Sequence, residues 1–347
     1  MERQTNKILI IKPSGIGDIV HSLPVAYGLK ELYPYSKIYW LVFTKFAKIL
    51  HNTPTVDKLL LWDRSGGLKE YVRVIKEIRS ERFDLVIDLQ GLLRTGIVSF
   101  FSAGKIRIAV SLLRECAWLF EKPVERFDPT MHAVDRNYRV VKYLSKGRSI
   151  PEPSSFLPWI HITEDEKDVA NKLIGGNKSP LVLFGVTSRG EHKIWSPENF
   201  TQLINRTVKE YNIMPVFLGM KEETELVRKV IDGINGEYID LTGKTDLRIA
   251  SAVVSLCRMV IGNDSSLIHI AAALGIPVIG LYGPTDPAQV GPYGDRNIVI
   301  LHKLPCSPCG IKTRCKTNRC MREITPEEVF EAVKKMFGVK PLESNKT

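Results

Sequence analysis

Three loops rich in charged and hydroxyl side chains each follow a run of apolar residues typical of a buried strand. The first loop, residues 12–24, contains two glycines, Asp18 and His21. The third glycine of a phosphate-binding GxGxxG pattern is missing, and Asp18 would repel a diphosphate. An ionised aspartate here can instead accept a proton from an attacking hydroxyl group. The alternative is that Asp18 only caps a helix, a position that favours aspartate.

The second loop, residues 185–197, follows the apolar run at residues 181–186. Thr187, Ser188, Arg189 and Lys193 place two hydroxyls, a guanidinium and an ammonium within seven residues. The loop ends where a helix is expected to begin, so backbone N–H groups also point outward there. This combination predicts a diphosphate-binding site. The alternative is a solvated charged loop in which Trp195 only packs.

The third loop lies within residues 260–277, where a strand-like run turns through Asn263, Asp264, Ser265 and Ser266 into an alanine-rich helix. A helix N-terminus attracts anions, and the two serines add hydrogen-bond donors. His269 follows Asp264 by five residues, so both are expected near the start of the helix. The alternative is a capping aspartate and a structural histidine.

The elements that must position these loops alternate between short apolar runs and longer amphipathic segments, which is typical of parallel sheets covered by helices. The expected strands are residues 7–12, 38–43 and 85–89 in the first half and 181–186, 216–218, 258–262 and 278–282 in the second half. The expected helices are residues 19–33 and 68–80, with others beginning near residues 197, 221, 246 and 265. The fold class is therefore α/β, with the pattern occurring twice.

At 347 residues the chain is longer than a domain with a single hydrophobic core usually is, and its 44% apolar residues are enough to form two cores. The Pro/Ser-rich stretch at residues 150–155 cannot continue a helix and marks a linker. We predict an N-terminal domain at residues 1–155, a C-terminal domain at 156–322, and a terminal helix and tail at 323–347 that packs back on the first domain. Two doubly wound domains would place the carboxyl ends of both sheets at an interdomain cleft.

The excess of Lys and Arg gives a net charge of +11, which favours anionic partners. Because the basic residues are dispersed and no RNP or zinc-finger pattern occurs, nucleic acid is not the expected partner. The N-terminal apolar run of four residues is too short for a signal peptide or a membrane span, so we expect a cytoplasmic protein.

Four of the six cysteines crowd one short stretch, at Cys306, Cys309, Cys315 and Cys320. A reducing compartment disfavours disulfides there. Four thiols can hold a structural metal, although their spacing fits no standard zinc module. The alternative is a loop of reduced thiols.

Taken together, these segments resemble the lipopolysaccharide heptosyltransferases of glycosyltransferase family 9, over nearly the whole chain. The resemblance rests on residues 14–18 and 21–24, on Asp88-Leu89-Gln90-Gly91, on residues 187–195, on residues 263–266 with His269, and on residues 282–287. It implies a GT-B fold of two facing Rossmann-like domains. Residues 131–137 look more like the enzymes that add the first heptose, heptosyltransferase I, than those that add the second.

The resemblance implies that Asp18 is the general base of an inverting transfer and that Lys193 acts on the leaving diphosphate. The implied donor-binding residues are Thr187, Ser188, Glu222, Thr245, Asp264, Ser265, Ser266 and His269, and the implied acceptor-binding residues are Gly17, Arg94 and Arg136.

The donor would be ADP-L-glycero-D-manno-heptose and the acceptor the Kdo sugar of lipid A or of inner-core lipopolysaccharide, at the anionic cytoplasmic face of the inner membrane, with no cofactor required. Another nucleotide sugar or the second-heptose acceptor remains an alternative, and a nucleotide-sugar epimerase or a nucleic-acid-binding protein is a more distant one.

Overall fold

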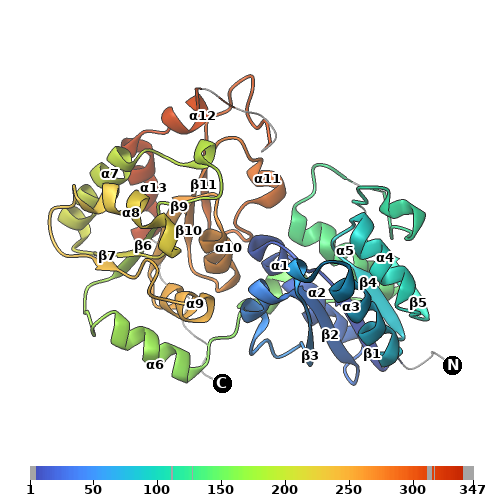
Figure 1. Cartoon of the computed structure of the whole chain (residues 1–347). Helices are drawn as coiled ribbons and strands as arrows, with labels where there is room; N and C mark the ends of the chain where they lie inside the picture. Colours follow the sequence, from blue (N-terminus) through green and yellow to red (C-terminus); the bar gives the residue numbers. More distant parts are fainter. Residues whose placement is uncertain (1–4, 111, 127, 311–314, 316, 339–347) are drawn as a thin grey trace. The chain divides into compact units, whose positions relative to one another are not determined.

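The computed structural model describes residues 5–110, 112–126, 128–310, 315 and 317–338. It divides into two compact units, unit 1 at Met1–His161 and unit 2 at Ile162–Thr347 (Figure 1). The sequence places the boundary between residues 155 and 156, a few residues earlier. None of the described helices is long and apolar enough to cross a lipid bilayer.

Unit 1 is built on a five-stranded parallel sheet in the order β3-β2-β1-β4-β5. Helix α2 packs against α5, and α3 packs against α4. Successive residues of the central strands are buried, which means that both faces of the sheet are covered. The strands are β1 Lys7–Ile11, β2 Lys37–Phe43, β3 Lys58–Trp62, β4 Leu85–Asp88 and β5 Ile106–Ala109. The helices are α1 Ile16–Val20, α2 Leu23–Leu32, α3 Gly67–Glu81, α4 Leu93–Phe101 and α5 Ala133–Ser145, with short 3-10 turns at η1 Thr44–Leu50, η2 Arg64–Gly66, η3 Ala117–Leu119 and η4 Pro153–Phe156.

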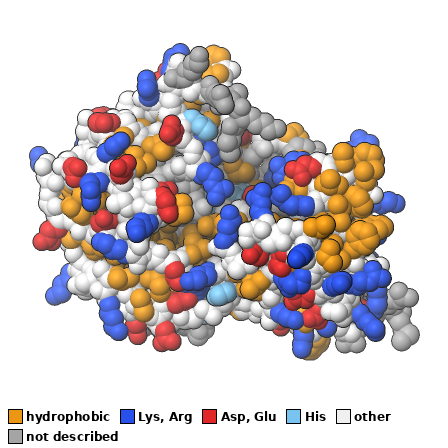
Figure 2. Space-filling view, viewed as in Figure 1, with side chains coloured by type: hydrophobic (Ala, Val, Ile, Leu, Met, Phe, Trp, Pro, Cys, Tyr) orange, Lys and Arg blue, Asp and Glu red, His pale blue; other side chains and the backbone are white. Residues whose placement is uncertain are grey.

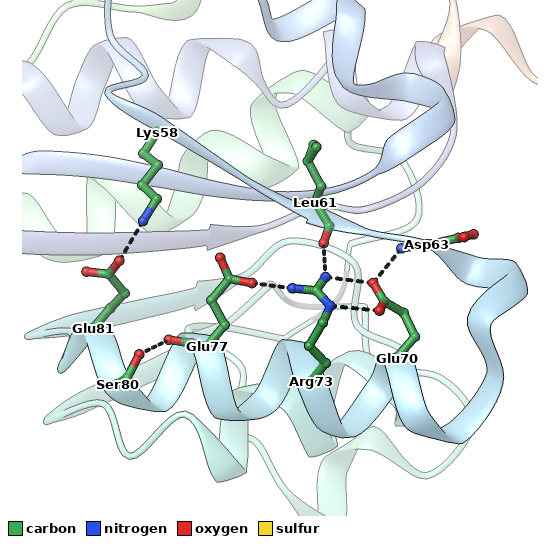
Figure 3. A network of polar contacts seen from close by, with 8 residues as sticks. All are labelled: Lys58, Leu61, Asp63, Glu70, Arg73, Glu77, Ser80 and Glu81. Atoms are coloured by element: carbon green, nitrogen blue, oxygen red, sulfur yellow. Dashed lines mark hydrogen bonds and ion pairs between the residues drawn. The ribbon is translucent and has the colours of Figure 1, made fainter.

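A network of charged side chains fixes α3 against the edge of this sheet (Figure 3). Arg73 donates to both Glu70 and Glu77 on its own helix and to the carbonyl oxygen of Leu61 in β3. At the far end of α3, Glu81 accepts a 2.7 Å hydrogen bond from Lys58. These contacts orient an amphipathic helix whose buried face is small.

Unit 2 contains a six-stranded parallel sheet in the order β11-β10-β9-β6-β7-β8. Its core includes Phe184, Trp195 and Phe200, all fully buried. The strands are β6 Leu181–Gly185, β7 Met214–Phe217, β8 Ile239–Asp240, β9 Met259–Asn263, β10 Val278–Tyr282 and β11 Ile298–Leu301. The helices are α6 Glu164–Leu173, α7 Pro197–Tyr211, α8 Thr224–Ile231, α9 Leu247–Ser255, α10 Ser266–Ala273, α11 Pro287–Val290, α12 Arg319–Arg322 and α13 Pro326–Gly338, with 3-10 turns at η5 Glu191–Lys193 and η6 Lys221–Glu223.

The C-terminal helix α13 is part of the core of unit 2. It packs against α7, β10 and β11, and Phe330 and Val333 are fully buried in that core. The sequence analysis places this terminal segment on the first domain, whereas the described part of it completes unit 2. The tail at residues 339–347 lies outside the described residues.

The predicted alternation of strands and helices is confirmed, and each predicted strand occurs within about three residues of its expected position. Four edge or near-edge strands, β3, β5, β8 and β11, were not predicted. Strand β8 has only two residues and β5 is interrupted by Arg107, so neither gives a clear apolar run. The helix expected at residues 19–33 is two helices, because Ser22 caps α2 and Pro24 occupies its first turn.

Both sheets follow the doubly wound order, in which the chain leaves a central strand first to one side and then to the other. The reversal falls between β1 and β4 in unit 1 and between β6 and β9 in unit 2. In open α/β sheets, ligands bind outside the carboxyl ends of the strands at this point. The loops after these four strands are therefore the places to look for a site.

Candidate active-site loops

The β1 loop of unit 1 holds Asp18 in the first turn of α1. Gly15, not Asp18, occupies the capping position of this helix, so the alternative that Asp18 serves as its N-cap is wrong. Gly15 has φ +81°, and a Cβ atom there would collide with the Asp18 carboxylate. The side chain of Asp18 is exposed. The loop thus presents a carboxylate to solvent beside a backbone that only glycine fits.

Two cations act electrostatically on Asp18. Lys12 is buried at the end of β1, and its Nζ donates to the carbonyl oxygen of Leu89 at 2.8 Å. Burial lowers the pKa of Lys12, while Asp18 partly opposes that shift. Arg136 in the first turn of α5 also has its pKa lowered by burial and partly restored by Asp18. The structure therefore brings together Asp18 and Arg136, which the sequence analysis assigned to base and acceptor roles.

The start of α5 packs onto the segment that links α1 to α2. Asn137 donates to the Ser22 hydroxyl at 2.9 Å, and the rings of His21 and His132 lie edge to face at 5.2 Å. His132 also caps α5 by accepting from Val134 N–H. The segment at residues 131–137, singled out in the sequence, is thus part of the surroundings of Asp18.

Two other predicted acceptor residues lie at the same edge of the sheet. Gly17 is in α1, next to Asp18. Arg94 begins α4 after β4, and its carbonyl oxygen accepts from the Tyr71 hydroxyl at 2.7 Å. Within the described part of the chain, the buried Nε atom of Arg94 has no hydrogen-bond partner.

The fully buried Asp88, the last residue of β4, fixes the loop that follows this strand. Its Oδ1 atom accepts from the N–H groups of Gln90 and Gly91 at 2.7 and 3.1 Å. The buried Glu121 lies beside it, and burial together with the Asp88 charge raises the pKa of Glu121 to about 10. Gln90 in turn accepts from the Ser14 hydroxyl at 3.4 Å. Glu121 therefore keeps its proton at neutral pH, and this buried carboxyl pair supports the loop beside Asp18.

In unit 2, Lys193, Asp264 and His269 form one buried cluster. Lys193 Nζ donates to Asp264 Oδ2 at 2.5 Å, and His269 Nε2 lies 3.6 Å from Oδ1. Burial alone would raise the pKa of Asp264, yet His269 and Lys193 hold it well below its ordinary range. All three residues are at most 8% exposed. Asp264 does not cap α10, because Ser265 occupies that position.

The β6 and β9 loops are joined by hydrogen bonds. Ser188 donates to the carbonyl oxygen of Asp264 at 2.5 Å, and Asn263 bonds both Trp195 N–H and the carbonyl oxygen of Val186. These contacts and the buried Trp195 side chain hold the β6 loop against the β9 loop, while Arg189 and Glu191 remain exposed.

The N-terminus of α10 lies at the centre of this arrangement. Ser265 and Ser266 are half-buried, and the Ser265 side chain does not bond its own helix. Thr187 is buried nearby in the β6 loop sequence, next to Ser188. Free helix N–H groups, two hydroxyls and the ammonium of Lys193 can together receive an anion.

The remaining predicted donor residues follow the neighbouring strands. Glu222 is exposed in η6 after β7, and Thr245 is half-buried in the turn after β8. The two loops meet where Gly243 N–H donates to the carbonyl oxygen of Gly219 at 2.9 Å. Glu222 and Thr245 therefore lie on the β7–β8 side of the same sheet edge.

The sequence analysis missed the supporting roles of Lys12, Asp88 and Glu121. Asp88 belongs to the Asp88-Leu89-Gln90-Gly91 motif, and its position as a polar residue at the end of an apolar strand could have indicated a supporting role. Glu121 lies 33 residues later, with no local pattern to connect it to Asp88.

The four crowded cysteines line one hollow together with His192 and Asn318. Over the described ranges, no three His, Cys, Asp or Glu side chains are arranged to hold a metal ion. The expectation of a possible structural metal at Cys306, Cys309, Cys315 and Cys320 therefore finds no support among the described residues.

Comparison with known sequences identifies relatives along most of the chain. The sequence model of glycosyltransferase family 9 (heptosyltransferase) matches residues 71–319. The lipopolysaccharide core heptosyltransferase OpsX of Haemophilus influenzae is 27% identical over 343 residues, covering 95% of this chain and 96% of that protein.

Solved structures share the fold. The glycosyl transferase family 9 protein from Veillonella parvula has a TM-score of 0.86 at 24% identity, covering 97% of this chain and 98% of its own. Escherichia coli heptosyltransferase WaaC with ADP has a TM-score of 0.74 at 23% identity, covering 95% and 99%. With two doubly wound sheets, this likeness confirms the predicted GT-B fold.

Proposed function

Since the chain belongs to glycosyltransferase family 9 (heptosyltransferase), we propose that it transfers heptose from ADP-L-glycero-D-manno-heptose to the Kdo sugar of the lipopolysaccharide inner core. Family membership makes the protein a heptosyltransferase. The particular donor and acceptor are our inference. They are supported by a relative named as a lipopolysaccharide core heptosyltransferase and by the structural likeness to an enzyme bound to ADP.

The observation that carries the proposal is the buried Lys193–Asp264 pair beside the N-terminus of α10. An ammonium has three donors, and Asp264 is its one hydrogen-bond acceptor among the described residues, so two donors remain for phosphate oxygens. Asp264 fixes the position of the ammonium group, and His269 lies against the other oxygen of Asp264. A helix N-terminus and a positioned cation suit a leaving diphosphate, whose negative charge grows in the transition state.

Asp18 supplies the other half of the reaction. The acceptor hydroxyl attacks the anomeric carbon, its proton passes to the Asp18 carboxylate, and the bond to the ADP β-phosphate oxygen breaks as the new glycosidic bond forms. A single displacement inverts the configuration at that carbon. A positioned general base typically contributes about 10²- to 10⁴-fold to such a rate.

The cations near Asp18 fit an acidic acceptor. Arg136 and Lys12 both act on Asp18, and Arg94 lies at the same edge of the sheet. A guanidinium binds carboxylate and phosphate groups through paired hydrogen bonds. A Kdo sugar carries a carboxylate, so these residues give the acceptor site its charge preference, and they suit an acceptor held at an anionic membrane surface.

The test is ADP release from ADP-heptose with and without Kdo-lipid A, combined with mass analysis of the lipid product. We expect release that depends on the acceptor and a product heavier by one heptose. The same assay with an acceptor that already carries one heptose distinguishes the first from the second transfer.

Other nucleotide sugars are tested as alternative donors in the same assay. Transfer from one of them, with ADP-heptose inert, would overturn the donor assignment while keeping the reaction class. Interconversion of the donor sugar without any acceptor would instead indicate an epimerase.

A further inference from the structure

Unit 1 exposes a cluster of large apolar side chains where α4, β5 and η3 meet. Its members, here called the apolar cluster, are Phe100 (44% exposed), Phe101 (45%), Ile106 (55%), Trp118 (64%) and Leu119 (60%). Figure 2 shows hydrophobic side chains gathered over this part of unit 1. Large contiguous apolar surfaces on a folded protein mark interaction sites.

The cluster is one surface rather than scattered residues. The rings of Phe100 and Phe101 meet edge to face at 5.3 Å, and Phe100 also lies 5.7 Å from the ring of Phe120, next to Leu119. Helix α4 packs against η3, which carries Trp118 and Leu119. The side chains therefore present a common apolar face.

The segment that carries this face has an excess of cations. Between Arg94 and Arg126 the sequence has six Lys or Arg and three Glu. One of the glutamates, Glu121, is buried with its pKa raised to about 10, so it adds no negative charge at neutral pH. The guanidinium of Arg107 lies 4.8 Å over the Phe100 ring, and Lys122 and Arg126 are exposed. The segment thus combines exposed apolar side chains with a net positive charge, and Arg107 lies against the cluster itself.

This combination matches the headgroup region of an anionic bilayer. Tryptophan prefers the boundary between lipid and water, leucine and phenylalanine enter the acyl region, and each Lys or Arg near the surface is attracted to anionic lipid. A second copy of the chain is a poorer partner, since a symmetric dimer would bring two positively charged segments together.

We propose that the apolar cluster is the surface by which the enzyme docks on an anionic membrane. The inference rests on the proposed function, in which the acceptor is anchored to lipid. The cluster belongs to unit 1, the same unit that carries Asp18 and the acceptor-side cations. Docking through this cluster would hold unit 1 at the surface that carries a membrane-borne acceptor.

Trp118 provides a direct probe. The chain has five tryptophans, and the other four, Trp40, Trp62, Trp159 and Trp195, are at most 5% exposed. A blue shift of the emission when vesicles are added, and quenching by brominated lipid, therefore report on Trp118. We expect both the blue shift and the quenching with vesicles containing phosphatidylglycerol, and weaker changes with phosphatidylcholine alone. In Trp118→Phe, the emission comes from the four buried tryptophans and should show neither change.

Vesicle sedimentation then tests the cluster as a binding surface. Replacing both Trp118 and Leu119 by serine should weaken partitioning onto anionic vesicles by about tenfold or more. The matched control is Tyr35→Ser with Leu68→Ser, two side chains of unit 1 that are 91% and 78% exposed outside the cluster. The control should bind like the parent.

Activity separates this proposal from the reaction itself. The Trp118/Leu119 variant should transfer slowly to acceptor embedded in vesicles and at the parental rate to a deacylated, soluble acceptor. Vesicle binding by a parent that transfers to neither acceptor would refute the reaction and leave the docking surface standing. An unchanged emission, an equal loss in the control variant, or a blue shift produced by protein concentration alone would overturn the docking surface.

Discussion

At the level of single residues, two carboxylates of the proposed site have opposite surroundings. Asp18 is exposed after a glycine turn, whereas Asp264 is buried against Lys193 and His269. The exposed carboxylate is available to accept a proton, and the buried one holds a cation in place. Identical side chains thus take different roles because their environments differ.

Replacing Lys193 tests both the chemistry and the pairing. Lys193→Met should lower the transfer rate by about 10²- to 10³-fold, because the leaving diphosphate loses a positioned cation. It should also lower the free energy of unfolding of unit 2 by about 3–5 kcal/mol, because Asp264 stays buried without its ammonium partner. Transfer assays and urea unfolding followed by circular dichroism measure the two effects.

The matched double variant separates them. Lys193→Met with Asp264→Asn removes both charges, so stability should largely return while transfer stays low. Recovery of transfer in the double variant would show that Lys193 acts only through stability.

The loop residues were predictable from sequence for a physical reason. Polar side chains directly after apolar runs must lie at the carboxyl edge of a parallel sheet, which identified Asp18, Lys193 and Asp264. Whether each aspartate capped a helix was not predictable, because the cap depends on where the helix begins by one residue. The Asp88–Glu121 pair depends on tertiary burial, which no local spacing encodes.

At the level of helices and strands, the short edge strands were not predicted by the sequence patterns. The buried central strands were predicted, because helices cover both faces and force a continuous apolar run. Edge strands such as β5 and β8 lack that signal. The exposed face at Phe100 and Phe101 was also missed, because apolar residues in a helix pattern usually indicate core.

The charges that hold α3 predict an acid-dependent loss of stability. Hydrogen bonds from Lys58 and Lys7 lower the pKa of Glu81 to about 2. A carboxyl whose pKa is lowered by folding stabilises the fold above its unfolded pKa, about 4.3, and loses that contribution as pH falls towards 2. Glu81→Gln should therefore be less stable than the parent at neutral pH, and the difference should shrink between pH 4.5 and 2.

Urea unfolding at a series of pH values measures this difference. Glu31→Gln, at an exposed position on α2, is the control and should differ little from the parent at neutral pH. A Glu81→Gln deficit that grows as the pH falls would contradict the ion-pair account of α3.

At the scale of the whole molecule, two units of one architecture divide the chemistry. The sequence predicted two doubly wound domains because the strand–helix alternation occurs twice, and the strand orders confirm it. The packing of α13 into unit 2 was not predicted, because its amphipathic pattern does not specify which core receives it. The proposed base and acceptor cations belong to unit 1, and the loops proposed to bind the diphosphate belong to unit 2.

Hydrogen exchange on the intact protein tests this division. If ADP binds at the N-terminus of α10 as proposed, it should slow amide exchange in the β6 and β9 loops, including residues 187–193 and 264–269. The β1 loop around Asp18 should be slowed only when the acceptor is added. If ADP slowed exchange only in unit 1, the proposed assignment of the nucleotide to unit 2 would be contradicted.

The central claim is that Asp18 removes the proton from the acceptor in a single displacement. The most direct measurement is acceptor-dependent ADP release from ADP-heptose by the parent and by Asp18→Asn, with ADP affinity measured by calorimetry in parallel. We predict a rate lower by about 10²- to 10⁴-fold in the variant, with the affinity for ADP unchanged. Release at the parental rate by Asp18→Asn would contradict the account and remove Asp18 from the mechanism.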